Sequence, residues 1–201
     1  MSVLNPQHIT AVILAGGKGR RLKGNDKGLV EFQQQPMVEH VLQAVDSRVA
    51  NIIINANRNI ERYESYGHPV ISDALSDFQG PLAGFCIAMS EASTSHILTL
   101  PCDGPFVSED YVARMAQALS QDPAAEMAVA HDGERMQPVH ALIPVSLLDS
   151  LRVFLASGER KIDRWYTQHK VALVDFSDKP EIFQNINTEA QLKHLEETDN
   201  D

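Results

Sequence analysis

Short runs of β-branched and apolar residues alternate with helical patterns along the chain, and no other feature restricts its fold as strongly. The β-type runs predict strands at 9–14, 51–55, 70–72, 96–100, 127–131, 139–143 and 171–176. The helical patterns lie between or after them, at 37–47, 81–92, 108–119, 145–156, 161–168 and 188–195. Such alternation is typical of a mainly parallel sheet with helices on both faces. We therefore predict an α/β protein with a three-layer α/β/α, Rossmann-like architecture.

Two helix starts and one chain end carry finer predictions. Ser108 is expected to cap the helix that follows it. Thr188 and Gln191 have the spacing of a capping box at the start of the last helix. The acidic tail 196–201 is expected to be disordered. A chain of 201 residues without an internal repeat or a low-complexity linker is expected to form one domain, 1–201.

Charge is distributed unevenly along the chain. The net charge is −10, yet residues 18–27 carry five basic side chains against one acidic side chain, a local net charge of +4. An acidic chain is a poor candidate for non-specific binding of nucleic acid, and the local positive charge favours a small anion. The two cysteines are too few for a disulfide framework, and neither a signal peptide nor a membrane span is evident. We expect a cytoplasmic protein with free thiols.

A glycine-rich segment, Leu14-Ala15-Gly16-Gly17-Lys18-Gly19-Arg20-Arg21, follows the first expected strand directly. Ligands of such sheets bind at the carboxyl ends of strands, where glycines let backbone N–H groups approach phosphates. Leu22 stands where a dinucleotide-binding motif needs its third glycine, and Asn25 stands where a Walker A motif needs lysine. We interpret the segment as a different kind of phosphate loop. The alternative is a plain turn with solvated charges.

Three polar side chains lie at or just beyond the ends of other expected strands. Asp103 follows strand 96–100 within the sequence PCDGP, and a carboxylate there can hold Mg²⁺ together with triphosphate oxygens. Asp73 follows the strand at 70–72, and Asn55 ends the strand at 51–55. The Asn55 amide can both donate and accept at the edge of a base. Ordinary turn or cap positions are the alternative for all three residues.

At this point the chain resembles a known group of enzymes. The text LAGGKGRR followed by Asp26-Lys27 is similar to the motif of nucleotidyltransferases that activate sugars, polyols and pterins. Six further segments occur in the order INANR (54–58), DFQGPLAG (77–84), PCD (101–103), HDGER (131–135), GER (158–160) and NINT (185–188). Together they resemble the molybdenum cofactor guanylyltransferase (MobA) family over about residues 9–195. Lys23, Gly104 and Glu189 depart from the pattern without removing an expected ligand.

The resemblance implies transfer of GMP from Mg-GTP to molybdopterin or its molybdate-loaded form, with release of pyrophosphate. It assigns the N-terminal half to the nucleotide and the C-terminal half to the pterin. GTP contacts are expected from Leu14, Ala15, Gly16, Gly17, Lys27, Asn55, Asp73 and Asp103, with Asp103 also on Mg²⁺. Pterin contacts are expected from Arg160, Asn185 and Asn187. Molybdenum-insertion proteins and chaperones of apo-molybdoenzymes are the protein partners that it suggests.

The chemistry of that reaction assigns three candidate catalytic residues. A phosphate monoester acceptor is ionised near neutral pH, since its second pKa is about 6, and it needs no strong base. Catalysis then consists of positioning two anions and stabilising the leaving pyrophosphate. Arg21 (with Lys18) suits the β- and γ-phosphates, Lys27 suits the α-phosphate, and Asp103 suits Mg²⁺.

Three rival functions remain open from the residues alone. A cytidylyltransferase acting on the same pterin would have a similar loop. A sugar-phosphate nucleotidyltransferase also resembles the chain at the loop, although such enzymes usually carry a sugar-binding extension. A nucleotide-binding adaptor that delivers cofactor without chemistry is the third rival, and the presence of both Lys27 and Asp103 argues against it.

Overall fold

The computed structural model describes residues 3–17, 25–73 and 80–198. Its central sheet has seven strands in the order β5-β4-β1-β6-β8-β7-β9. In chain order the strands are β1 (Ile9–Leu14), β4 (Asn51–Asn55), β5 (Val70–Ile71), β6 (His96–Pro101), β7 (Met127–His131), β8 (Met136–Pro144) and β9 (Val171–Asp175). Neighbouring strands run parallel except at β8, which is antiparallel to both β6 and β7. The prediction of a mainly parallel sheet is confirmed.

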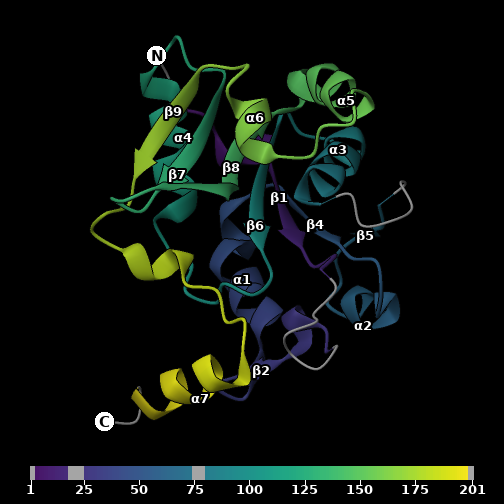
Figure 1. The fold of residues 1–201 in the computed structure, drawn as a ribbon, viewed down its shortest axis with the longest axis vertical. Coiled ribbons are helices and arrows are strands. Elements are labelled where there is room, and N and C mark those ends of the chain that lie inside the picture. The colour runs from purple at the N-terminus through teal and green to yellow at the C-terminus, as the bar shows by residue number, and fades with distance from the viewer. Residues whose placement is uncertain (1–2, 18–24, 74–79, 199–201) are drawn as a thin grey trace.

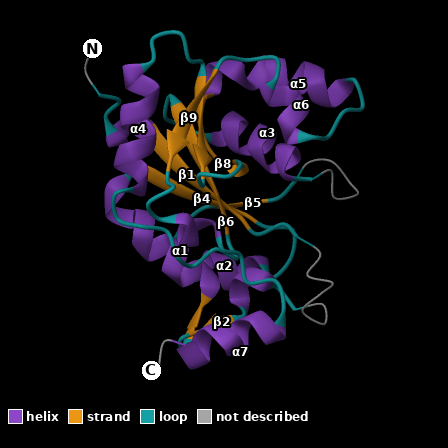
Figure 2. Cartoon of the chain, turned by 60° about the vertical axis from the view of Figure 1, so that its left-hand side comes forward, coloured by secondary structure: helices purple, strands orange, loops and turns teal. Residues whose placement is uncertain are grey.

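Helices cover both faces of this sheet, as Figure 1 and Figure 2 show. One face carries α1 (Met37–Val45) and α4 (Tyr111–Gln121), and the other carries α3 (Pro81–Glu91), α5 (Leu148–Ala156) and α6 (Ile162–Tyr166). Alternation along β1 explains the two layers. Ile9, Ala11 and Ile13 join the apolar cluster under α1 and α4, whereas Val12 joins the cluster under α3, α5 and α6. The predicted three-layer architecture is confirmed.

A smaller third cluster lies at the end of the molecule that carries α7 (Glu189–Thr198). There a two-stranded ribbon, β2 (Glu31–Phe32) and β3 (Gln35–Pro36), packs Phe32 against Ile186 and the partly buried Leu192. Figure 1 and Figure 2 both place α7 beside β2. This ribbon and α2 (Ile60–Glu64) were not predicted, because such short elements show no clear periodicity in the sequence. Five short 3₁₀ helices complete the described chain: η1 (Pro6–His8), η3 (Lys27–Leu29), η4 (Asp46–Arg48), η5 (Val145–Leu147) and η6 (Pro180–Phe183).

Two local predictions are wrong. Ser108 does not cap α4, because the helix begins at Tyr111 and the Ser108 hydroxyl hydrogen-bonds to the Asp110 carboxylate at 2.6 Å. The chain is not disordered from Glu196, because α7 continues through Thr198; residues 199–201 lie outside the described part. The capping box forms in a shifted version. Thr188 Oγ1 accepts from Gln191 N at 3.2 Å, while Gln191 Oε1 accepts from the N–H of Asn187, one residue before the expected one.

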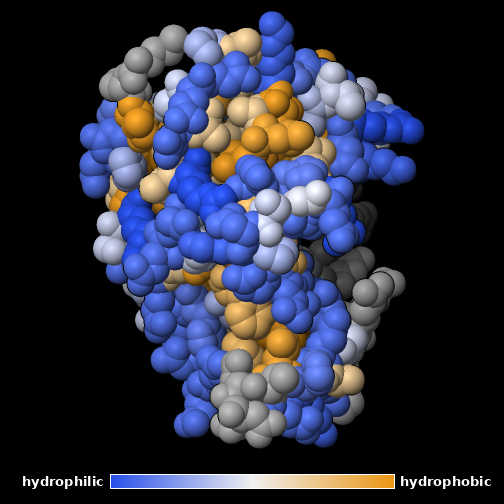
Figure 3. All heavy atoms as spheres, turned by 90° about the vertical axis from the view of Figure 1, so that its left-hand side faces the viewer, coloured by the Kyte–Doolittle hydropathy of each residue, from blue (hydrophilic) through white to orange (hydrophobic). Residues whose placement is uncertain are grey.

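The face that carries α4 and β9 is mostly hydrophilic, with apolar residues exposed in separate areas (Figure 3). Leu173 of β9, which is 57% exposed, is one of three large hydrophobic residues that the described surface exposes. None of the described helices has the length and apolar content needed to span a membrane. Cys86 and Cys102 are both free, as the sequence predicted.

Candidate active site

Four parallel strands end at one level of the sheet. Leu14, the last residue of β1, pairs with Asn55 of β4 and with Pro101 of β6, and Asn55 pairs in turn with Ile71 of β5. The loops that follow these strands therefore leave the sheet side by side. Two backbone hydrogen bonds extend the pairing past Leu14: Ala15 N donates to Asn55 O at 2.8 Å, and Cys102 N donates to Leu14 O at 3.2 Å. Ligands of open α/β sheets bind at such an edge, where neighbouring crossovers diverge.

A cavity of about 320 Å³ opens at this edge. It draws its lining from the end of β1, the ends of β4 and β6, the start of α3 and the segment before α7. The described lining consists of Leu14, Gly16, Gly17, Asn55, Asp73, Gly80, Pro81, Pro101, Asp103, Val139 and Asn185. Other hollows on the molecule have larger volumes, but the polar groups that the sequence analysis selected converge here.

Lys27 and Asp103 form an ion pair at this edge of the sheet. Lys27 Nζ donates to Asp103 Oδ2 at 2.7 Å and to Asn187 Oδ1 at 2.5 Å. The Asp103 residue is only 7% exposed, so its charge is largely shielded from water. Two oxygen atoms from distant parts of the chain thus converge on one cation. An oxygen-lined position of this kind also suits a hard divalent metal ion.

A second buried carboxylate holds the loop that carries Lys27. Asp26 accepts hydrogen bonds from Tyr63 OH at 2.7 Å and from Asn59 Nδ2 at 2.9 Å, and Arg58 Nε lies 3.4 Å from it. Burial, together with the nearby Asp26 carboxylate, raises the pKa of the Tyr63 hydroxyl, which therefore stays a donor. Asp26 lies at the start of η3, so these bonds place Lys27, the next residue, over the sheet edge.

Close packing at Gly28 fixes the same loop. A Cβ on Gly28 would lie 2.7 Å from Tyr63 OH and 3.1 Å from the Cβ of Cys102. Such distances leave no room for a larger residue, so glycine is required by contact rather than by backbone angle. Burial raises the pKa of the Cys102 thiol, which supports the packing role expected of a buried cysteine.

On the other side of the cavity, Asn55 and Asp73 face each other. Asn55 Nδ2 donates to Asp73 Oδ1 at 3.0 Å, and Asn57 Nδ2 donates to Asp73 Oδ2 at 2.8 Å. Asn55 is 3% exposed, and Gly84 of α3 packs directly against it: a Cβ on Gly84 would lie 2.4 Å from Asn55 Oδ1. The pair presents fixed acceptors and donors to a ligand in the cavity.

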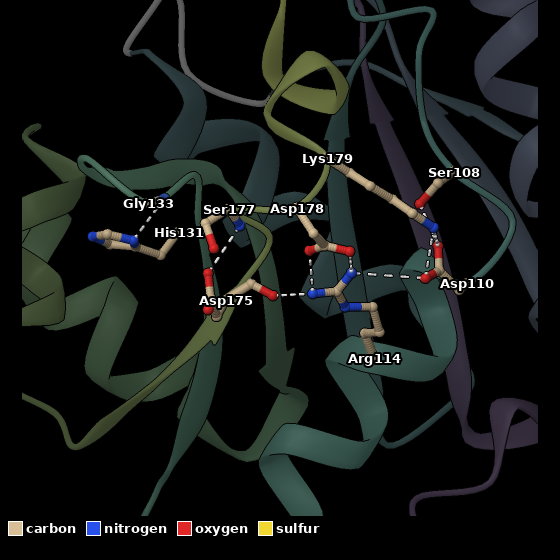
Figure 4. Close-up of polar contacts among 9 residues, drawn as sticks. All are labelled: Ser108, Asp110, Arg114, His131, Gly133, Asp175, Ser177, Asp178 and Lys179. Atoms are coloured by element: carbon tan, nitrogen blue, oxygen red, sulfur yellow. Dashed lines mark hydrogen bonds and ion pairs between the residues drawn. The ribbon is translucent and has the colours of Figure 1, made fainter.

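A C-terminal segment, residues 175–187, brings Asn185 to the cavity and Asn187 to the Lys27 ammonium. Its far end is tied to Asp103, whose carbonyl accepts from Ile186 N at 2.9 Å. Its near end is held by ion pairs with α4 (Figure 4). Arg114 donates two hydrogen bonds of 2.9 Å to the Asp178 carboxylate, and Lys179 Nζ lies 2.9 Å from both oxygens of Asp110.

Arg114 has two further partners in the same segment. Its guanidinium donates to the carbonyl of Asp175 and stacks over the Phe176 ring at 4.2 Å from the centroid. The hydrogen bond from Lys179 lowers the pKa of the Asp110 carboxyl to about 2, so that pair stays charged at neutral pH. The segment is therefore anchored at both ends, which fixes where its asparagines reach the site.

The structure brings most of the predicted site residues together but not all of them. Lys27 is in direct contact with both Asp103 and Asn187. Ala15 is buried next to the cavity. The predicted residues that line the cavity are Leu14, Gly16, Gly17, Asn55, Asp73, Asp103 and Asn185. Arg160 instead lines a separate hollow between α3 and α5, where it donates to the Leu155 carbonyl at 2.7 Å. Arg21 and Lys18 lie outside the described residues.

Two positioning networks escaped the sequence analysis. Tyr63 and Asn59 support Lys27 through Asp26, and Asn57 supports Asp73. Asp26 was visible as part of the Asp-Lys motif, but nothing in the sequence showed that α2 would supply its partners. Asn57 was visible in the text NANR, where it was indistinguishable from a solvated turn residue.

Comparison with known proteins gives consistent matches. A family model described as the MobA-like NTP transferase domain matches residues 11–172. A molybdenum cofactor guanylyltransferase from Shewanella loihica is 49% identical over 194 residues, which cover 96% of this chain and 98% of the relative. Another, from Shewanella amazonensis, is 51% identical over 187 residues, covering 93% and 95%.

Solved structures share the fold. The molybdopterin-guanine dinucleotide biosynthesis protein A from Archaeoglobus fulgidus matches with a TM-score of 0.77 at 22% identity, covering 95% of this chain and 98% of that one. A 4-diphosphocytidyl-2C-methyl-D-erythritol synthase from Anaerococcus prevotii matches with a TM-score of 0.74 at 14% identity, covering 98% and 100%. At these identities the likeness concerns the fold alone.

The fold, the geometry of the site and the sequence matches together show that this chain is a nucleotidyltransferase with an α/β fold. Within that class it belongs to the MobA-like NTP transferase family, together with the molybdenum cofactor guanylyltransferases of Shewanella.

Proposed function

We propose that this protein transfers GMP from Mg-GTP to molybdopterin or its molybdate-loaded form and releases pyrophosphate. Relatives that match nearly the whole chain are named molybdenum cofactor guanylyltransferases. One observation in the chain supports it most strongly: the Lys27 ammonium and the Asp103 carboxylate meet 2.7 Å apart on the strand-end edge that carries Gly16 and Gly17. Transfer of a nucleotidyl group needs a phosphate-binding turn, a cation for the α-phosphate and a metal-binding carboxylate in one place.

Asp103 is the residue that would hold the metal ion. Its carboxylate and the side-chain oxygen of Asn187 already converge on the Lys27 ammonium, so a cation fits between them. The described residues contain no group of three or more His, Cys, Asp or Glu side chains able to hold a metal by themselves. The Asp103 carboxylate and the Asn187 side-chain oxygen suit Mg²⁺, which takes one or two carboxylates and completes its coordination shell with phosphate oxygens and water. When bound, the ion would neutralise charge on the phosphates.

The remaining roles follow from charge and position. The N–H groups of Gly16 and Gly17 and the Lys27 ammonium would bind the triphosphate, with Arg21 as a further cation from the loop. Asn185 and Asn187, on the C-terminal segment, would contact the pterin part of the acceptor. Arg160 lines the hollow between α3 and α5, so it would contact the pterin only if the pterin reached that hollow. The acceptor phosphate is already ionised at neutral pH, so positioning replaces base catalysis.

Asp73 supports guanine over cytosine as the base. A carboxylate has about four acceptor sites, and Asn55 and Asn57 use one on each oxygen. The remaining sites suit the two neighbouring donors of guanine, its N1–H and its 2-amino group. Cytosine offers one donor beside acceptor atoms on the same edge, which a carboxylate matches poorly. This arrangement favours a guanylyltransferase over the cytidylyltransferase that the sequence left open.

A single assay separates the proposal from its rivals. Pyrophosphate release is measured with GTP, CTP and ATP in parallel, with and without Mg²⁺, using molybdopterin or a sugar phosphate as the acceptor. The proposal expects release only with GTP, Mg²⁺ and molybdopterin together. Faster release with CTP would indicate a cytidylyltransferase, release with the sugar phosphate would indicate the second rival, and tight GTP binding without release would indicate an adaptor.

A further inference from the structure

Two asparagines lie at the carboxyl end of β4, Asn55 as its last residue and Asn57 two residues beyond it, and they differ in position. Asn55 lines the cavity, whereas Asn57 is not part of its described lining. Both described hydrogen bonds of the Asn57 amide nevertheless go to Asp73. Nδ2 donates to Asp73 Oδ2 at 2.8 Å, and Oδ1 accepts from Asp73 N at 2.9 Å. One side chain thus binds both the carboxylate and the backbone of Asp73.

The contact between Asn57 and Asp73 lies just beyond the end of the pairing between β4 and β5. Pairing between β4 and β5 covers two residue pairs and ends at Asn55 and Ile71. Beyond it, Ala56 N donates to Ile71 O at 2.9 Å and Ser72 Oγ donates to Ala56 O at 2.8 Å. The Asn57–Asp73 pair is the next link. Asp73 is therefore fixed by side-chain bonds and not by strand geometry, and its carboxylate plane depends on the two asparagine donors.

Asn57 also contacts Gly16, in the glycine-rich segment that follows β1. A Cβ placed on Gly16 would lie 2.9 Å from Asn57 Nδ2, so the amide packs directly against the backbone of Gly16. A single side chain therefore contacts both the turn that would bind phosphate and the carboxylate that would bind the base. The two ends of a nucleotide must be held at a fixed separation, and contact through one planar amide supplies it.

We propose that Asn57 is a positioning residue that sets base selectivity by fixing Asp73 relative to Gly16. The inference rests on the proposed function, because it takes GTP as the ligand. Asn57 would not touch the nucleotide. Its loss should weaken recognition of the 2-amino and N1–H groups of guanine. It should leave the chemistry at Lys27 and Asp103 intact, since the described hydrogen bonds of Asn57 go to Asp73 and the Lys27 loop is held separately through Asp26.

The test compares GTP with ITP, which lacks only the 2-amino group. For Asn57→Ala we expect the KM for GTP to rise about tenfold, the scale of the lost hydrogen bonds, with kcat within about threefold of wild type. The preference for GTP over ITP should narrow several-fold, a change that general loosening of the fold would not produce. Asn51→Ala is the matched control, because Asn51 begins the same strand and its side chain bonds only to Ser93 among described partners.

Asn57→Asp is the second variant, in case the alanine variant does not fold. It keeps the shape but places an oxygen against Asp73 Oδ2, so at neutral pH it should weaken GTP binding at least as much. Wild-type GTP affinity and wild-type GTP-to-ITP preference in the folded variant, or a loss confined to kcat, would overturn the inference. Calorimetry of GTP and ITP binding separates the inference from the proposed function. Wild-type protein that binds GTP but transfers nothing refutes the function, while the dissociation constants of Asn57→Ala for GTP and ITP still test the inference.

Discussion

At the residue scale, the candidate site contains one lysine and one aspartate that form an ion pair. Lys27 Nζ lies 2.7 Å from Asp103 Oδ2, on a carboxylate that is largely buried. A buried charge without a partner is costly, so the ion pair stabilises both side chains in their positions in the protein without nucleotide. A metal ion bound at Asp103 would compete with the Lys27 ammonium for the same carboxylate.

The first prediction concerns Asp103. Asp103→Ala should lower kcat by about a thousandfold, the scale seen when a preorganised electrostatic partner of the transition state is lost. The fold should remain, because Asp103 joins the C-terminal segment through its backbone carbonyl, which alanine keeps. Pyrophosphate release and a thermal melt measure the two effects. Turnover near the wild-type rate would remove Asp103 from its assigned role.

Lys27 carries the second prediction, tested by Lys27→Met, which keeps an unbranched side chain one atom shorter and removes the charge. The variant should lose kcat far more than GTP affinity, because its ammonium is assigned to the transition state. In the absence of nucleotide it should also bind Mn²⁺ several-fold more tightly, because the cation that competes for Asp103 is gone. Electron paramagnetic resonance of free Mn²⁺ measures this, and unchanged or weaker binding would contradict the competition.

At the element scale, the ends of strands and the starts of helices shape the cavity by close contact. The first turn of α3 lies against β4 because Gly84 lacks a side chain: a Cβ there would meet Asn55 Oδ1 at 2.4 Å. Glycine within a helix costs about 1 kcal/mol relative to alanine. Glycine is nevertheless needed at this position, because a side chain there would collide with Asn55.

The third prediction uses this conflict. Gly84→Ala should gain helix propensity yet displace the Asn55 amide, so the free energy of unfolding should change little while the KM for GTP rises about tenfold. Ser90→Ala, on the same helix and outside the described lining of the cavity, is the control and should leave the KM unchanged. Urea unfolding and steady-state kinetics give the two numbers. A variant with wild-type KM would show that Asn55 needs no such contact.

At the scale of the whole molecule, a buried histidine joins the sheet to its covering elements. His140 of β8 is 3% exposed, hydrogen-bonds to Tyr111 of α4 through Nδ1 at 3.2 Å, and meets the Phe183 ring edge-on at 4.9 Å. Burial lowers the pKa of His140 to about 3. The imidazole is therefore neutral in the folded protein at every ordinary working pH.

This lowered pKa predicts a loss of stability in acid. Between about pH 6.5 and pH 3 the unfolded chain binds a proton at His140 that the folded chain does not, so stability falls as the pH falls through this window. From pH 7 to pH 5 the loss should be about 2 kcal/mol. His140→Phe should be less stable at pH 7 by about 1 kcal/mol, because Tyr111 loses its partner, yet lose less between pH 7 and pH 5. Urea unfolding at both pH values measures the difference, and parallel losses in the two proteins would refute the assignment.

The sequence by itself determined the layers and the location of the site. Alternating apolar patterns need a sheet covered on both sides, and parallel strands carry their loops to one edge, so Gly16, Asn55, Asp73 and Asp103 had to converge. These conclusions depend on the periodicity of apolar residues and on the order of motifs along the chain, both of which can be read from a single sequence.

Only the tertiary structure decided which partners each of those residues meets. Asn187 reaches Lys27 across 160 positions of sequence, α2 supplies the donors to Asp26, Asn57 fixes Asp73, and Arg160 lines a different hollow. No local pattern encodes such contacts, because they arise from the path of segments between strands and from side chains that approach within 3 Å. Packing, rather than periodicity, thus makes a general nucleotide-binding edge into a particular site.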